Sequence, residues 1–393
     1  MAYAAGRWGE AKQNYTWYLV RQPGDPQVLR KYIDCCLQLL NNRSAQMRDA
    51  GRAYLQLALG NRSDRALLDE ATAFYKTCRL WRELDYATEI LPRDYPDDRD
   101  FAFLRALAMD RLGRAIPAIE AYQRLVASGQ ARPEVYGNLA LLLLEQGLGE
   151  QAGQLLDNAL AAHPAVADIR VQRARYYLAR RDFSRASEEI DAALAAGMET
   201  AEALLVAANV RRASRDWQAA QSLAEKAVAV DPSAAEGYLL IAHSYVANRQ
   251  TDKAIALLSD SDPQVVADNP QLHLFLAELQ INAGRLDEAE QSMEAYRQMH
   301  PDEPYVPEYL AARRLLREGR TSDAISKLEV VAQQFPDLRA ARYFLGLAYL
   351  ETGQRDRAKS TLELYLKSTP DDENARAVWE TAFLERPVQE LEA

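Results

Sequence analysis

Apolar residues along the chain recur at the spacing of amphipathic helices. Ala358, Leu362 and Tyr365 are four and three positions apart, and the same spacing returns upstream. One face of an α-helix presents residues at this interval. Runs rich in Val, Ile and Thr with strict alternation are scarce, while the strong helix formers Ala, Leu, Arg, Glu and Gln dominate. The pattern therefore predicts an all-α chain.

The helical pattern itself repeats at a fixed interval. A motif beginning with Gly or Arg ends five residues later in a small residue, as in Gly353–Ala358 and Gly319–Ala324. The spacings between successive small residues are 34, 34, 34, 34, 35, 35 and 34. These residues are Ala118, Ala152, Ala186, Ala220, Ala254, Ala289, Ala324 and Ala358. A period of this length indicates a stack of short repeated units.

Physical chemistry explains why such units must stack. Each is expected to be two antiparallel helices, with Gly or Arg in the turn and proline ending the second helix. Small residues let the two helices approach closely. Ordering 34 residues costs roughly 50 kcal/mol, so one unit alone is not stable and neighbours must cover its apolar faces.

The repeat resembles the tetratricopeptide repeat, a 34-residue unit with small residues at positions 8 and 20 and proline at position 32. The resemblance covers nearly the whole chain and implies an all-α superhelical solenoid of about ten helix-turn-helix units. Position 8 holds Ala106, Ala140, Ala174, Ala208, Ala242, Ala277, Ala312 and Gly346. Position 32 holds Pro96, Pro164, Pro232, Pro301, Pro336 and Pro370.

This register divides one continuous solenoid into three parts. Residues 1–98 hold a half-repeat and two irregular units, residues 99–372 hold eight regular units, and residues 373–393 form a capping helix and tail. The regular units are expected to begin near Phe101, Pro133, Ala167, Ala201, Ala235, Pro270, Tyr305 and Arg339. Because Gly6–Ala11 reads as the second half of a unit, the chain is interpreted as a piece of a longer protein. The alternative is a natural N-terminus with an irregular cap.

Charge and composition narrow the range of partners. The net charge is −10, from 57 acidic and 47 basic residues, which argues against a nucleic-acid groove and against an anionic membrane surface. No apolar run reaches the roughly 18 residues that a membrane span needs. Three cysteines, Cys35, Cys36 and Cys78, do not form a disulfide framework and are expected to be free thiols.

The sequence contains no recognised catalytic or metal-binding motif. Phosphate loops, dinucleotide-binding glycine motifs, His-Glu-x-x-His, Cys-x-x-Cys and the Gly-x-Ser-x-Gly elbow are all missing. His163 and His300 each precede a proline that ends a repeat, so both are expected in solvated loops. We therefore predict no enzyme activity, cofactor or metal for this chain.

The first helix of each unit is expected to line an inner groove, as the resemblance implies. Position 2 carries acids in five successive units, a possible rail for a basic partner: Asp100, Glu134, Asp168, Glu202 and Glu236. The simpler interpretation is that the helix macrodipole favours acids in a first turn. Polar residues at positions 6 and 9 extend the candidate set: Asn138, Gln172, Arg175, Asn209, His243, Glu278 and Arg313.

Positions 5 and 6 become apolar towards the C-terminus. Phe275, Tyr309 and Tyr343 are the aromatic candidates there, and they would suit an amphipathic helix or an extended apolar segment. The alternative is that these side chains belong to the core between neighbouring helices.

Two functional hypotheses follow. The first is a non-enzymatic scaffold that binds a protein or peptide segment, basic or amphipathic, in its groove. The second is the repeat region of a larger protein: bacterial envelope machinery for polysaccharide export or secretion, or a multidomain enzyme. Self-association through the solenoid ends is a further possibility. The compartment, cytoplasmic or periplasmic, is left open.

Overall fold

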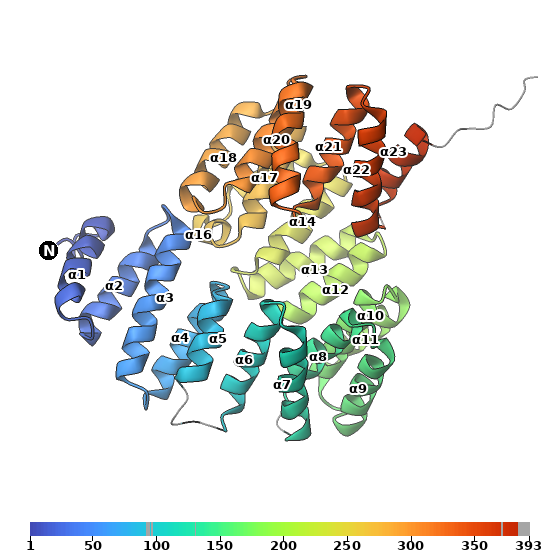
Figure 1. Cartoon of the computed structure of the whole chain (residues 1–393). Helices are drawn as coiled ribbons and strands as arrows, with labels where there is room; N and C mark the ends of the chain where they lie inside the picture. The colour runs from blue at the N-terminus through green and yellow to red at the C-terminus, as the bar shows by residue number, and fades with distance from the viewer. Residues whose placement is uncertain (92–94, 96, 130, 371, 384–393) are drawn as a thin grey trace, which may run out of the picture. The chain divides into compact units, whose positions relative to one another are not determined.

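The computed structural model describes residues 1–91, 95, 97–129, 131–370 and 372–383. In this part of the chain all regular elements are helices, and most pair as antiparallel hairpins (Figure 1). The first helices of the pairs are α2 (Pro26–Gln38), α4 (Arg65–Thr77), α6 (Arg99–Arg111), α8 (Pro133–Glu145), α10 (Ala167–Ala179), α12 (Ala201–Ala213), α14 (Ala235–Ala247), α17 (Pro270–Asn282), α19 (Tyr305–Arg317) and α21 (Arg339–Glu351).

Within the described ranges the second helices complete ten hairpins, so the predicted all-α solenoid of about ten units is confirmed. They are α3 (Arg43–Gly60), α5 (Trp81–Ile90), α7 (Ala115–Ala127), α9 (Gly149–Ala162), α11 (Phe183–Ala195), α13 (Trp217–Val230), α15 (Thr251–Ser259), α18 (Leu286–Met299), α20 (Thr321–Gln334) and α22 (Arg355–Ser368). Among the helices of the described residues, three lie outside this pairing: α1 (Trp8–Arg21), the short α16 (Pro263–Ala267) and α23 (Glu373–Phe383), which packs against α22.

First helices begin at the predicted residues in all the regular units except the earliest. There α6 starts at Arg99 rather than Phe101 because the Asp98 carboxylate caps it, accepting hydrogen bonds from the backbone N–H groups of Asp100 and Phe101. Pro96, which is predicted to end a repeat, lies outside the described residues. The same holds for residues 384–393, which the sequence predicts as the C-terminal tail.

Small residues do hold the hairpins together. Every alanine at position 20, from Ala118 to Ala358, is fully buried. At position 8 the alanines from Ala106 to Ala312 are also fully buried, and Gly346 approaches so closely that an added Cβ would meet Leu362 Cγ at 2.6 Å. A larger side chain at these positions would force the two helices apart, so the 34-residue period reflects a packing requirement.

The turn inside each regular hairpin uses a left-handed residue. Gly353 has φ +74° and Gly113 has φ +73°, conformations that glycine adopts without steric cost. Three units place arginine here instead, with φ values of 63° at Arg181, 62° at Arg215 and 59° at Arg249. A side chain in this region costs roughly 1–2 kcal/mol, so these turns are held by the packing of their helices.

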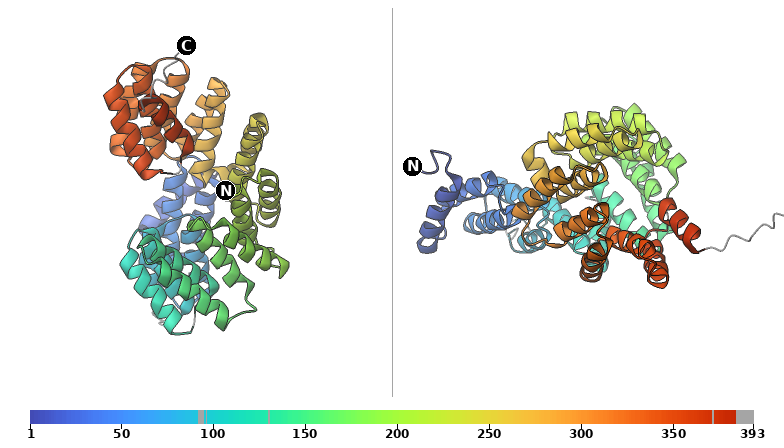
Figure 2. Two further views of the ribbon diagram at one scale, coloured as in Figure 1. Left: turned by 90° about the vertical axis from the view of Figure 1, so that its right-hand side faces the viewer. Right: turned by 90° about the horizontal axis from the view of Figure 1, so that it is seen from above.

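The chain divides into two compact units, Met1–Asn269 (unit 1) and Pro270–Ala393 (unit 2). Within each unit the hairpins stack side by side in chain order (Figure 2). Unit 1 contains several successive apolar clusters along the stack, and unit 2 contains one large cluster that includes Tyr296, Tyr309 and Tyr349. The three cysteines are free thiols; Cys35 and Cys36 are buried.

Two features differ from the sequence-based expectation. His300 is not solvated: only 5% of it is exposed, because its backbone N–H bonds Tyr296 O at the end of α18 and its ring packs 4.8 Å from the Tyr296 ring. His163, by contrast, is exposed as expected. The second difference is α15, which stops at Ser259; Asp262 and Pro263 then start the separate helix α16.

Candidate functional site on the inner wall of unit 1

The first helices of unit 1 form one continuous wall. Successive first helices pack against each other, α8 with α10, α10 with α12 and α12 with α14, more closely than successive second helices do. A stack in which one set of helices is closer together curves towards that set. We call the exposed faces of α8, α10, α12 and α14 the inner wall.

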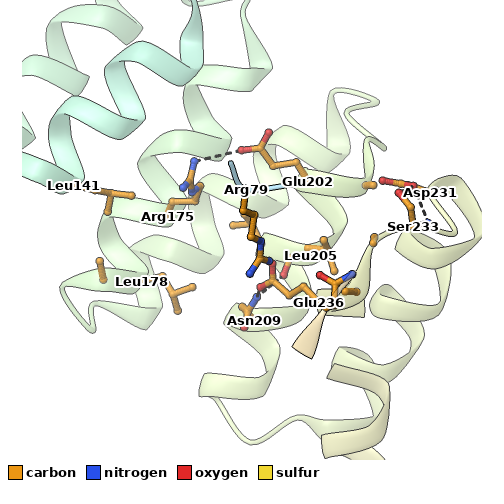
Figure 3. Close-up of a pocket in the computed structure, with 16 residues that line it drawn as sticks. Arg79, Leu141, Arg175, Leu178, Glu202, Leu205, Asn209, Asp231, Ser233 and Glu236 are labelled. Carbon is orange, nitrogen blue, oxygen red and sulfur yellow. Dashed lines mark hydrogen bonds and ion pairs between the residues drawn. The ribbon is translucent and has the colours of Figure 1, made fainter. Parts of the chain in front are cut away.

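A pocket of about 790 Å³ lies on this wall (Figure 3). Its apolar floor comes from Leu141, Leu178, Leu205 and Val206. Polar side chains on α10, α12 and α14, and in the loop before α14, lie around this floor. Four residues predicted from the sequence line it together: Arg175, Glu202, Asn209 and Glu236. A volume of this size is within the range of typical ligand sites.

The predicted acids in the pocket bind partners in the preceding unit. Arg175 Nη1 lies 3.4 Å from Glu202 Oε1, and Asn209 Nδ2 donates to Glu236 Oε1 at 2.7 Å. Gln172 is buried behind them and its Nε2 donates to Glu202 Oε1 at 3.2 Å. Position 9 of one unit is therefore linked to position 2 of the next, and the same acids remain exposed towards the pocket.

Two acids on the same wall are less well compensated. The pKa of Asp168 is raised, first by burial and then by the negative charges of Glu134 and Glu202. Glu134 Oε2 is buried and has no hydrogen-bond partner among the described residues. The three carboxylates on α8, α10 and α12, which we call the acidic strip, are thus close enough to repel one another. Asp100 is different, because Arg65 and Arg132 contact it at 3.3 and 3.4 Å.

Two residues that were not predicted from the sequence form the far side of the pocket. Arg79, in the turn between α4 and α5, and Asn269, two residues after the end of α16, both line it. Figure 3 shows the Arg79 side chain between Glu202 and the Asn209–Glu236 pair. These residues are remote in sequence from the inner wall. Arg79 occupies the left-handed turn position of its hairpin (φ 55°), which does not mark it as a pocket residue, and Asn269 lies outside the regular hairpins. Leu141, at position 9 of its unit, could have been found from the register.

The remaining predicted residues of α8, α14 and α17 do not line this pocket. Asn138 is buried, and its Nδ2 lies 3.4 Å from the Tyr122 hydroxyl that it contacts. His243 is exposed on α14, and Phe275 is half-buried on α17.

In unit 2 the predicted residues form a separate cluster. The Tyr309 hydroxyl donates to Glu278 Oε1 at 2.7 Å, and Arg313 lies 3.5 Å above the Phe344 ring. Tyr309 is fully buried and Arg313 is 7% exposed, while burial raises the pKa of Glu278. The half-buried Tyr343 packs edge-on against Phe344 at 5.1 Å. This arrangement joins neighbouring helices and leaves little polar surface for a ligand.

The described residues show neither a metal-binding cluster nor a membrane-spanning helix. They contain no group of three or more His, Cys, Asp or Glu side chains arranged to hold a metal ion. None of the helices in the described ranges combines the length and apolar character that crossing a bilayer requires.

Comparisons with known proteins agree with the repeat structure. The family model described as tetratricopeptide repeat matches residues 211–268, 262–313 and 315–378. Over these residues the chain matches the tetratricopeptide repeat, and its regular hairpins keep the same register before residue 211. This fold is typical of proteins that bind other proteins.

Solved structures with similar folds include distant proteins from several organisms. Yeast Tom70 has 13% identity over 97% of this chain and 93% of its own, with a TM-score of 0.49. PilF of Pseudomonas aeruginosa has 19% identity over 56% and 96%, with a TM-score of 0.44. The protein TTC0263 of Thermus thermophilus has 23% identity over 47% and 100%, with a TM-score of 0.37. No curated protein gives a significant match.

Proposed function

We propose that the chain is a scaffold that binds an extended segment of a partner protein in the pocket on the inner wall of unit 1. The observation that carries this proposal is the convergence of Arg175, Glu202, Asn209 and Glu236 over an apolar floor. A few placed polar groups around apolar side chains are the usual composition of a site that orients a ligand.

The charges of the wall favour a segment with a basic side chain beside an apolar one. Glu202, Asp231 and Glu236 line the pocket together with two cations, Arg79 and Arg175. The acidic strip continues the negative charge along α10 and α8. A Lys or Arg of the partner would relieve the repulsion that raises the pKa of Asp168. An apolar neighbour of that residue would cover Leu178 and Leu205.

Site-specific photocrosslinking tests where the partner binds. A photoreactive phenylalanine analogue replaces Leu178 in the pocket floor or, as the matched control, Ile116 on α7, which is 69% exposed and does not line the pocket. We expect crosslinks to one peptide segment at position 178 and none to that segment at position 116. Crosslinking of the same segment at both positions, or only at position 116, would contradict the proposal.

The partner segment is then identified by mass spectrometry of the crosslinked peptide. We expect a Lys or Arg within a few residues of the crosslinked, apolar position. A segment rich in Asp and Glu would leave pocket binding in place but contradict the proposed role of the acidic strip.

A further inference from the structure

One contact in unit 1 joins residues that are 225 positions apart. Arg43 begins α3, and Asp268 directly follows α16; their side chains pair through Nε–Oδ1 at 2.6 Å and Nη2–Oδ2 at 3.1 Å. Figure 1 shows α16 beside α3. Units of a solenoid normally contact only their neighbours, so this contact exists because unit 1 curves back on itself.

Arg43 is buried, and its guanidinium group is hydrogen-bonded on both sides. Its side chain is 2% exposed, and the remaining donor, Nη1, bonds the carbonyl oxygen of Leu37 at 3.0 Å. Two parallel hydrogen bonds to one carboxylate match the planar fork of a guanidinium. A buried guanidinium without its carboxylate is strongly unfavourable, so the position of Asp268 matters to α3.

Helix α16 is the element that brings Asp268 there. The second helix of its unit ends early at Ser259, and the Asp262 carboxylate accepts a hydrogen bond from Gln264 N to start a new helix. Val266 and Ala267 on α16 are buried. Because α15 ends early, its hairpin is shorter than the others, and the chain after it turns towards α3.

The same contact sets the far side of the pocket. Cys78 Sγ lies 3.5 Å from Met47 Sδ on α3, and burial together with the charge of Asp268 raises the pKa of Cys78 to about 12. The next residues along the chain, Arg79 after Cys78 and Asn269 after Asp268, are the two that close the pocket opposite the inner wall.

We propose that the Arg43–Asp268 pair is a latch that closes unit 1 around the pocket. When the pair separates, Arg79 and Asn269 move away from the inner wall and the pocket opens to a partner segment. That a partner segment enters the opened pocket rests on the proposed function. Opening of the latch is tested without any partner, so a negative result for the latch does not contradict partner binding, and the reverse also holds.

The alkylation rate of Cys78 reports the state of the latch. The full chain is treated with iodoacetamide, and modification of each cysteine-containing peptide is followed by mass spectrometry. We expect Asp268→Asn to accelerate alkylation of Cys78 about tenfold or more while the buried Cys35 and Cys36 keep their wild-type rates. Asp191→Asn, which removes the exposed Arg211–Asp191 pair, is the control and should leave all three rates unchanged.

A second variant separates opening from a change of charge, because loss of the Asp268 carboxylate would by itself lower the pKa of Cys78, whereas loss of Arg43 would raise it. It also decides the case if Asp268→Asn unfolds the chain and all three cysteines react. Arg43→Met removes the buried charge and keeps its apolar stem, while the partly exposed Asp268 can be solvated. Selective acceleration at Cys78 in Arg43→Met supports the latch, as would a larger radius of gyration by small-angle scattering. Wild-type alkylation of Cys78 in this folded variant would overturn the proposal.

Discussion

Asn209 on α12 donates a hydrogen bond from Nδ2 to Oε1 of Glu236 on α14, at 2.7 Å. The same relationship links Arg175 to Glu202, again 27 positions apart in the chain. Acids that the sequence suggested as a rail for a partner therefore also tie successive units together. Binding a partner is compatible with this internal link, because each carboxylate can accept more hydrogen bonds than the one it accepts within the chain.

The Asn209–Glu236 bond gives a first prediction. Asn209→Asp places a carboxylate against Glu236, and we expect the free energy of unfolding to fall by about 1 kcal/mol. Glu236→Gln in the same chain should recover most of the loss, since its amide can donate to the carboxylate introduced at position 209. Urea denaturation measures both, with Asn14→Asp on the exposed face of α1 as control. Additive effects of the two substitutions would contradict the coupling.

A second prediction concerns the left-handed turns. Gly353 has φ +74° and no described atom within 4 Å of an added Cβ, so Gly353→Ala should cost about 1 kcal/mol through the backbone alone. Gly24 is equally open but does not have this conformation, and Gly24→Ala should be neutral or slightly stabilising. Equal unfolding midpoints for the two variants would show that the turn conformation carries no such cost.

Arg313 in unit 2 supplies a third prediction. Arg313→Met should lower the free energy of unfolding by about 3 kcal/mol, because Glu278 loses its charged partner 3.6 Å away in a buried site. Adding Glu278→Gln should restore much of the stability, and thermal unfolding of the single and double variants measures this. A wild-type midpoint for Arg313→Met would mean that this cluster does not stabilise unit 2.

The buried His273 predicts a pH dependence. Burial, and secondarily His300, lowers its pKa to about 4 from an ordinary value near 6.5, so the folded chain keeps it neutral. Between about pH 6.5 and pH 4 the unfolded chain binds a proton that the folded chain does not. Stability should therefore fall as the pH falls through this window, by up to about 3 kcal/mol from this group.

The measurement compares urea denaturation on the two sides of this window, near neutral pH and near the lowered pKa of His273. His273→Phe should show a smaller loss of stability than the wild type over this interval, whereas His163→Phe, at an exposed site, should behave as the wild type. If His273→Phe showed the same pH dependence as the wild type, His273 would not be the cause of the loss of stability.

Features of the fold that depend on local, periodic contacts could be predicted from the sequence, whereas contacts between residues far apart in the chain could not. The hairpins and their register could be predicted because Ala118, Ala152 and their equivalents must be small wherever two helices cross, and this requirement is local and periodic. The inner-wall residues Glu202 and Asn209 follow directly from that register. His300 was misjudged because its burial depends on the contact with Tyr296, which the proline after it does not reveal.

The far side of the pocket could not be predicted in this way. Arg79 and Asn269 reach it only because unit 1 curves through enough repeats to bring α3 and α16 together. That curvature is the sum of small rotations between units, and no single residue encodes it. The Asp262–Pro263 pair does indicate the start of a new helix in the sequence. That this helix brings Asp268 to Arg43 could not be predicted, because it depends on where α3 lies.

The most direct measurement of the central claim is the affinity of the crosslinked partner segment for variants of the acidic strip. Glu134→Gln, Asp168→Asn and Glu202→Gln together remove three charges from the inner wall. The matched control, Glu120→Gln, Glu150→Gln and Glu188→Gln, removes three charges from exposed positions on α7, α9 and α11.

At about 0.2–1 kcal/mol for each charge contact with the partner, we expect the strip variant to bind about tenfold more weakly by titration calorimetry. The control variant should keep the wild-type affinity. Equal affinities for the wild type and the strip variant, or an equal loss in the control, would contradict binding along the inner wall.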